Sequence, residues 1–198
     1  MNYDLHGPWS QSSDPRTSIH STLLQANNVP GKENFAIQYG GIEAINTVLD
    51  AGFGADKLQM GIAQYARAFG GVEDNGGMEN LPGYNATWTH AATIDEMGKT
   101  NTNSDGFVPY KSIQKMTQKD GYLQKNVIDP ETLMTVGGYI YNPNTKVFVG
   151  YESPEEVVSA CKFIKEKGLK GAIMWSVDTD LPVSNPASLI ATYRNAGC

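Results

Sequence analysis

The side chains with the most suggestive chemistry come from three short stretches of the sequence that have the pattern of β-strands and their ends. Aromatic rings can stack on the apolar face of a pyranose, and the polar tips of Asp, Arg and Tyr can bind its hydroxyl and amide groups. One strand-end aromatic residue is more often part of a core than of a binding site, but three strands ending in this way favour a carbohydrate site. The residues are Tyr3, Asp4 and Trp9 from the first stretch, Tyr65 and Arg67 from the second, and Trp175 and Asp178 from the third.

Three segments are predicted to be the strands that position these side chains. Residues 57–63 and 171–177 are nearly continuous apolar runs, which are typical of strands covered on both faces. Residues 1–5 alternate in polarity before a Gly-Pro turn and read as a shorter strand. In parallel sheets ligands bind beyond the carboxyl ends of the strands, so these side chains should meet at one edge.

Helical patterns separate the predicted strands. Apolar residues recur at helical spacing over residues 42–49. A capping box with proline at the first helical position begins at Ser153 and predicts a helix that ends at Gly168. A last helix is predicted from Asn185 onward. The alternation of strands and helices is typical of a parallel α/β protein.

The middle of the chain breaks this alternation. Residues 70–148 are rich in glycine and asparagine, with a possible helix at 111–117 and a hairpin around 142–146. We interpret this stretch as an inserted α+β subdomain. A second irregular stretch, the polar loop at 10–41, is long enough to suggest a functional role.

The composition excludes several classes of function. The chain has 198 residues and a net charge of -6, with no basic cluster, so nucleic-acid binding has no electrostatic support. No apolar run is long enough to cross a membrane. The three histidines are too dispersed for a metal site. A bridge between Cys161 and Cys198 is disfavoured, because parallel helices would place the two residues about 8 Å apart in height at roughly 1.5 Å per residue.

Three motifs, in this order along the chain, resemble those of family 18 glycoside hydrolases, the chitinases. Residues 1–9 (MNYDLHGPW) resemble the sixth-strand motif, and the Tyr-x-Arg pattern at Tyr65 and Arg67 resembles the seventh strand. Residues 148–152 together with 175–178 resemble the exit of the insertion and the eighth strand. The resemblance implies an α/β fold: a partial (β/α)8 TIM barrel comprising the last three βα units, formed by residues 1–69 and 149–198, with residues 70–148 as the inserted α+β subdomain.

The same resemblance implies a role for each site residue in a cleft for β-1,4-linked N-acetylglucosamine. In that family the N-acetyl oxygen of the substrate attacks the anomeric carbon, and a glutamic acid on the fourth strand protonates the leaving oxygen. No cofactor or metal is implied. The implied catalytic residues are Tyr3, which orients the N-acetyl group, and Asp4; the implied substrate-binding residues are Met1, Trp9, Tyr65, Arg67 and Trp175.

The sequence departs from the family in two respects. Segments that would correspond to strands one to five of the barrel are missing, so the three expected strands cannot close an eight-stranded barrel. The acid motif Asp-x-x-Asp-x-Asp-x-Glu is absent, so we expect a C-terminal portion that is inactive alone and completed by an N-terminal barrel half in the same or a companion chain. The expected ligand is chitin or a chitooligosaccharide, and the resemblance implies an extracellular protein. Two alternatives stay open: a non-catalytic chitin-binding lectin, and a different hydrolase that uses Asp178 and Asp180 as acid and base.

Overall fold

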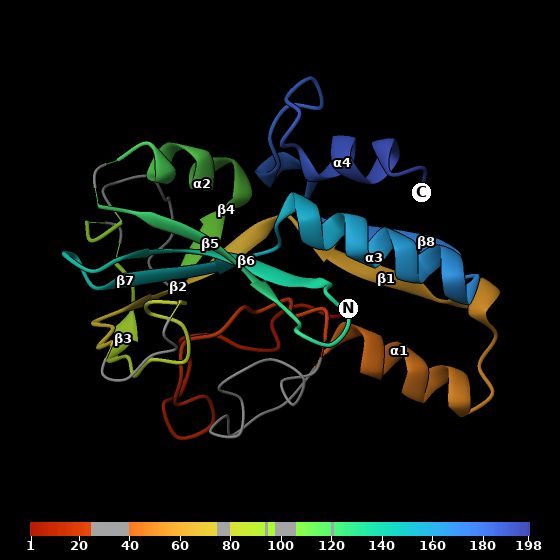
Figure 1. Cartoon of the computed structure of the whole chain (residues 1–198), viewed down its shortest axis with the longest axis horizontal. Helices are drawn as coiled ribbons and strands as arrows, with labels where there is room; N and C mark the ends of the chain where they lie inside the picture. Colours follow the sequence, from red (N-terminus) through yellow and green to blue (C-terminus); the bar gives the residue numbers. More distant parts are fainter. Residues whose placement is uncertain (25–39, 75–79, 94, 98–105, 120) are drawn as a thin grey trace.

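The described residues form two β-sheets with helices packed beside them (Figure 1). The computed structural model describes residues 1–24, 40–74, 80–93, 95–97, 106–119 and 121–198. Part of the expected loop at 10–41 therefore lies outside the described residues. No helix of the described part is long and apolar enough to span a membrane.

The smaller sheet is the parallel pair that the apolar runs predict. Strand β1 (Gln59–Ala63) pairs with β8 (Gly171–Trp175), so that Ala63 lies opposite Trp175. The carboxyl ends of the two strands are therefore adjacent. This pairing connects two segments that are more than 100 residues apart in sequence, and it brings the second and third groups of candidate site residues to one edge.

Three helices pack around this pair (Figure 1). They are α1 (Gly41–Asp50), α3 (Pro154–Lys167) and α4 (Leu189–Asn195). Helix α3 begins where the capping box predicts: the Ser153 side chain accepts a hydrogen bond from the Glu156 N–H, and Gly168 ends the helix at a φ of 64°. Helix α4 begins later than expected, because Asn185 makes a turn with Ala187 and Ser188 caps the helix instead.

The larger sheet contains the hairpin and the irregular middle of the chain. Its order is β3-β2-β7-β6-β5, with β4 also paired to β2, and α2 (Tyr110–Thr117) lies next to β4. The expected boundaries at 69/70 and 148/149 fall within β2 and β7, both of which belong to this sheet. The strands are β2 (Tyr65–Gly70), β3 (His90–Ala91), β4 (Phe107–Pro109), β5 (Leu123–Ile128), β6 (Thr135–Asn142) and β7 (Val147–Tyr151).

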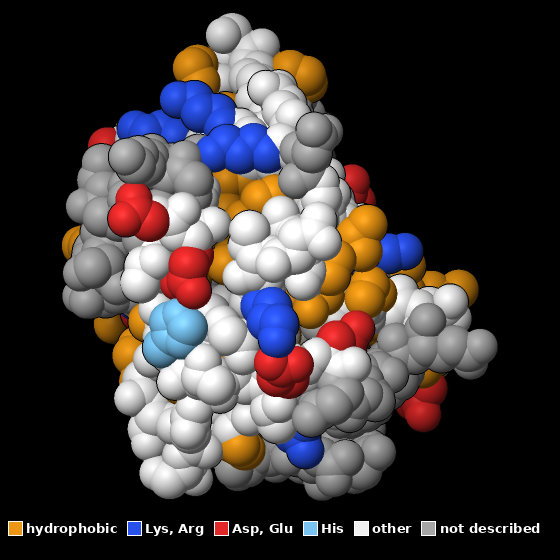
Figure 2. Space-filling model, turned by 90° about the vertical axis from the view of Figure 1, so that its left-hand side faces the viewer, with side chains coloured by type: hydrophobic (Ala, Val, Ile, Leu, Met, Phe, Trp, Pro, Cys, Tyr) orange, Lys and Arg blue, Asp and Glu red, His pale blue; other side chains and the backbone are white. Residues whose placement is uncertain are grey.

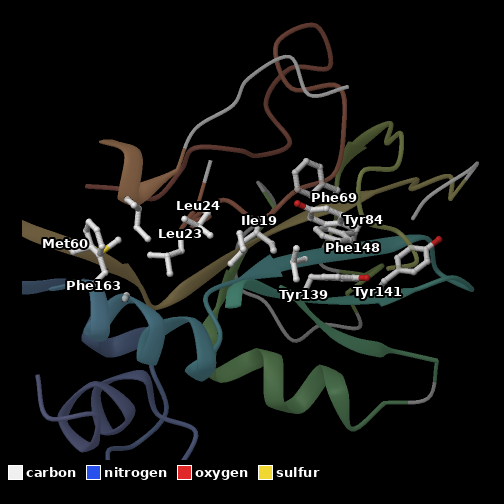
Figure 3. Packing of buried hydrophobic residues seen from close by; sticks show 14 of the residues in the cluster. Ile19, Leu23, Leu24, Met60, Phe69, Tyr84, Tyr139, Tyr141, Phe148 and Phe163 are labelled. Atoms are coloured by element: carbon white, nitrogen blue, oxygen red, sulfur yellow. The ribbon is translucent and has the colours of Figure 1, made fainter. Parts of the chain in front are cut away.

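One hydrophobic cluster connects the two sheets, as Figure 3 shows. It contains Met60 from β1, Phe69 from β2, Phe148 from β7 and Phe163 from α3. Ile19, Leu23 and Leu24 from the predicted polar loop are also buried in it. This part of the loop is thus a core segment, and burial of its apolar side chains fixes the loop against both sheets.

The first residues do not form the expected strand. The Gly61 N–H of β1 donates to the Asn2 side chain instead of to a backbone carbonyl, and Asp4 has a φ of 59°, which interrupts an extended conformation. Leu5 N–H donates to the His20 carbonyl. The segment nevertheless lies against β1, since an added Cβ on Gly61 would come within 2.8 Å of the Tyr3 ring.

The prediction about the two cysteines was wrong. Cys161 and Cys198 form a disulfide, with their Cα atoms 5.9 Å apart. The height estimate failed because α4 ends at Asn195 and the chain then turns at Gly197, with a φ of 80°, toward α3. The bridge links the C-terminus to the middle of α3.

Candidate functional site

The centre of the candidate site is an ion pair between Asp4 and Arg67. Arg67 Nε and Nη2 donate to Asp4 Oδ1 and Oδ2, each at 2.9 Å. Such a two-point contact fixes the orientation of both groups. Partial burial raises the pKa of Asp4, but hydrogen bonds and charge from His20 and Arg67 outweigh it and hold that pKa well below its usual value. Asp4 is therefore an anion over the physiological pH range.

Aromatic rings surround the guanidinium of Arg67. Its Cζ atom lies 5.3 Å from the Tyr65 ring centroid, 5.5 Å from that of Trp9 and 5.9 Å from that of Phe107. Tyr65 and Phe107 are stacked with their centroids 5.2 Å apart. The exposed Trp9 ring and the charged pair thus offer both an apolar surface and hydrogen-bonding groups to a ligand.

His20 connects the segment that carries Asp4 to strand β2. It is fully buried; its Nδ1 accepts the Asp4 backbone N–H at 3.3 Å, and its Nε2 lies 2.9 Å from the Tyr65 carbonyl oxygen. Because a carbonyl only accepts, Nε2 carries a proton. Nδ1 also lies 3.5 Å from Asp4 Oδ1. Burial also lowers the pKa of His20. The ring therefore stabilises the left-handed backbone of Asp4 against β2.

Tyr3 lies beside this cluster with its hydroxyl uncommitted. Its ring meets that of Tyr65 edge-on at 6.0 Å, and its buried Oη makes no hydrogen bond within the described residues. Burial and the nearby carboxyl groups of Asp4 and Glu152 raise the pKa of Tyr3. The hydroxyl is thus protonated and has a proton to donate. Burial, followed by the charge of Asp4 and a hydrogen bond to it, likewise raises the pKa of Tyr65.

Trp175 is connected to the start of β2 by a backbone hydrogen bond. Its carbonyl accepts the Gln64 N–H at 2.7 Å, which places it next to the start of β2, and its side chain is 58% exposed. Met1 is 90% exposed, and no interaction within the described part of the chain joins it to the cluster. The structure therefore brings together five predicted residues (Tyr3, Asp4, Trp9, Tyr65 and Arg67), with Trp175 at the adjacent strand end.

Asp178 and Asp180 do not form an acid–base pair. Asp180 is 5% exposed and its carboxylate accepts from Gln64, Ser188 and the first backbone N–H groups of α4. It is a buried cap of α4, as expected for an anion at a helix N-terminus. The Asp178 carboxylate instead accepts the Ser176 hydroxyl at 2.6 Å. Sequence patterns also missed Phe107 and His20: the first lies in an irregular region, and the second was one of three dispersed histidines.

The structure shows no set of side chains suited to a metal ion among the residues it describes. The model of "Glycosyl hydrolases family 18" matches residues 1–180. The chain belongs to glycosyl hydrolase family 18. The match covers all of the candidate site residues.

Relatives within the family are similar over nearly the whole chain. An endochitinase of Brugia malayi is 28% identical over 91% of this chain, which corresponds to 31% of that protein. Endochitinase 1 of Metarhizium robertsii is 26% identical over 98% of this chain and 38% of that protein. The class V chitinase of Nicotiana tobaccum, solved with NAG4, superposes with a TM-score of 0.70 at 23% identity, covering 99% of this chain and 47% of that one. The chain spans less than half the length of these family 18 relatives.

Proposed function

We propose that this chain forms part of the substrate cleft of a chitin-degrading family 18 hydrolase. The observation that carries this proposal is the cluster of Tyr3, Asp4, Tyr65 and Arg67, with Trp175 at the neighbouring strand end. It combines exposed aromatic surface, a fixed anion and cation, and a tyrosine hydroxyl with no internal partner. These groups match the apolar face, hydroxyls and acetamido group of N-acetylglucosamine.

The residues would act by binding and orienting the sugar. The free hydroxyl of Tyr3 would donate to the acetamido group and hold it for attack on the anomeric carbon, which is substrate-assisted catalysis. Asp4 and Arg67 would bind polar groups of the same or the next sugar, and Trp175 would stack under the ring. Met1 would line the acetyl pocket, and Trp9 would support the leaving-group side. No residue of this chain is assigned as the acid that protonates the leaving oxygen.

We further propose that the acid comes from an N-terminal barrel half, in the same or a companion chain. Two observations support this idea. The parallel sheet of the described residues has only β1 and β8, whereas a closed barrel of this type needs eight strands. Ile173 of β8 is also exposed, together with the following Val177, as they would be if a missing neighbour normally covered them.

The second candidate function is a chitooligosaccharide-binding lectin. The missing acid motif favours it, because binding requires only the aromatic and polar side chains of the cleft. The coding sequence upstream of Met1 discriminates between the two: a frame that encodes the acid motif supports the hydrolase, and one in which its glutamate is replaced supports the lectin. The disulfide supports an extracellular location for either, since such bridges persist in oxidising compartments.

Replacing Trp175 by alanine tests the binding surface. We expect the affinity for chitotetraose to fall by about 1–3 kcal/mol, because the substitution removes a large aromatic surface from the ligand. Isothermal titration calorimetry measures the change. Trp175→Phe should retain most of the affinity, and Leu133→Ala, an exposed apolar residue elsewhere, should retain all of it. Unchanged affinity in Trp175→Ala would remove this residue from the site.

A further inference from the structure

The candidate site contains a residue in an unfavourable backbone conformation. Asp4 has a φ of 59°, in the left-handed region, which is unfavourable for residues that have a Cβ. Such a conformation persists only where surrounding contacts hold it, and it occurs most often at functional sites. The carboxylate of this same residue pairs with Arg67. The contacts that fix the Asp4 backbone therefore determine where the anion of the site lies.

His20 supplies contacts to the backbone at this point. Its ring Nδ1 lies 3.3 Å from the Asp4 backbone nitrogen, and its carbonyl oxygen accepts the Leu5 N–H at 2.8 Å. The same Nδ1 lies 3.5 Å from Asp4 Oδ1. One residue, 16 positions further along the chain, thus holds two successive N–H groups and adjoins the carboxylate between them.

The opposite side of the His20 ring is fixed to β2. Its Nε2 lies 2.9 Å from the Tyr65 carbonyl oxygen and donates to it, and the two rings have their centroids 4.6 Å apart. Tyr65 precedes Arg67 by two residues on the same strand. The His20 ring therefore sets the distance between the segment that carries Asp4 and the strand that carries Arg67.

His20 itself cannot contact a ligand. It has no exposed surface, and the histidine surface visible in Figure 2 belongs neither to it nor to His6, which is also buried. An effect of His20 on sugar binding must therefore pass through another residue. The Asp4 carboxylate is partly exposed and lies next to the His20 ring, so it connects the ring to a ligand.

The pair with Arg67 does not fix the Asp4 backbone by itself. Both side chains of the pair are partly exposed, so water competes for their hydrogen bonds and the pair contributes little free energy. The two-point contact orients the carboxylate relative to the guanidinium, but it does not determine the φ of Asp4. The buried hydrogen bond to the His20 ring acts on the backbone directly.

We propose that His20 is a positioning residue of the sugar site, an inference that rests on the proposed function. By accepting the Asp4 N–H and donating to the Tyr65 carbonyl, the ring holds the Asp4 carboxylate where it can bind both Arg67 and the polar groups of a sugar. Without the Nδ1 contact, Asp4 can leave the left-handed conformation, and its carboxylate then moves away from the ligand.

Two amide substitutions separate the two contacts of the ring. His20→Asn places an acceptor near the position of Nδ1, whereas His20→Gln places its amide near the position of Nε2 and leaves the Asp4 N–H without an acceptor. In calorimetric titrations with chitotetraose, we expect His20→Gln to bind about tenfold more weakly than wild type, because the displaced carboxylate loses a charged hydrogen bond to the sugar. His20→Asn should stay within about twofold of wild type, because the amide oxygen still accepts.

The same titrations in an Asp4→Asn background show whether His20 acts through Asp4. There His20→Gln should weaken binding by less than about twofold, because the carboxylate that the ring positions is already absent. His6→Gln is the matched control. It replaces another buried histidine, whose ring faces the Asp14 carboxylate, and it should leave the affinity unchanged even if it lowers the free energy of unfolding.

A measurement on the unsubstituted protein does not depend on the folding of any variant. Long-range proton–nitrogen NMR spectra should show that His20 Nδ1 carries no proton at neutral pH, since only then can it accept the Asp4 N–H. A protonated Nδ1, wild-type affinity in His20→Gln, or an undiminished loss in the Asp4→Asn background would overturn the positioning role while the proposed function stands. If the wild-type protein does not bind chitotetraose, both are overturned.

Discussion

Cys198→Ser should lower the free energy of unfolding by about 4 kcal/mol. The disulfide joins residues separated by 37 positions, and a cross-link that closes a loop of this length restricts the unfolded chain by about that amount. Urea or thermal unfolding measures the loss, and the midpoint temperature should fall by about 10 °C. Because the loop contains β8 and α4, the strand that carries Trp175 loses an anchor at the same time.

Reduction is the matched control for this substitution. A thiol reductant should destabilise the wild-type protein to the same extent as Cys198→Ser and have no effect on the variant. Cys198 is the better position to change because it is exposed, whereas Cys161 is buried and its replacement would also disturb the packing of α3. Equal unfolding midpoints of the reduced and oxidised proteins would show that the bridge does not restrict the chain.

Glu156→Gln should raise the stability of the protein at neutral and mildly alkaline pH. Glu156 is 1% exposed, and neither of its carboxyl oxygens makes a hydrogen bond of good geometry within the described residues. Burial first, and then the neighbouring carboxyl of Glu152, raise the pKa of Glu156 well above its usual value. Burial likewise raises the pKa of Glu152 to about 8. The substitution removes one of two buried carboxyl groups whose ionisation the folded protein disfavours, and with it the free-energy cost of that group.

The direction of the pH dependence follows from these shifts. Above the usual glutamate value of 4.5, the unfolded chain releases protons that the folded protein still binds. Stability therefore falls as pH rises from about 4.5 to about 8. Glu156→Gln should flatten this decline. The free energy of unfolding should rise by about 2–4 kcal/mol near pH 8 and change little near pH 4.5. Urea unfolding at several pH values measures it.

Glu155→Gln is the control for charge alone. Glu155 is the adjacent residue in the first turn of α3 but is exposed. Its replacement removes a favourable charge at the helix N-terminus. The free energy of unfolding should fall by a few tenths of a kcal/mol over most of the pH range. A Glu156→Gln protein that is less stable than wild type near pH 8, or that keeps the full pH slope, would contradict the buried-acid account.

Local sequence patterns predict the regular elements of this fold well. The capping box at Ser153 and the terminal Gly168 set the limits of α3, and the apolar runs predict β1 and β8. The hairpin of β6 and β7 follows from its turn residues. These features depend on the chemistry of neighbouring residues, which a single sequence contains in full.

Features that depend on long-range contacts were harder to predict. The Cys161–Cys198 bridge depends on how the chain turns after α4, and the burial of His20 depends on a loop that enters the core. The strand-end pattern predicted that Tyr3, Asp4, Tyr65 and Arg67 gather, but not that they meet through a left-handed Asp4 and a strand of the larger sheet. Phe107 joins them only through the pairing of β4 with β2.

The most direct test of the central claim is to map, by amide chemical shifts, where chitotetraose touches the protein. The claim is that three separate segments form one sugar-binding surface. We predict concerted shifts at Asp4, Trp9, Arg67 and Trp175, with a single dissociation constant fitting all of them. Shifts confined to other surfaces, or different constants for the three segments, would contradict it.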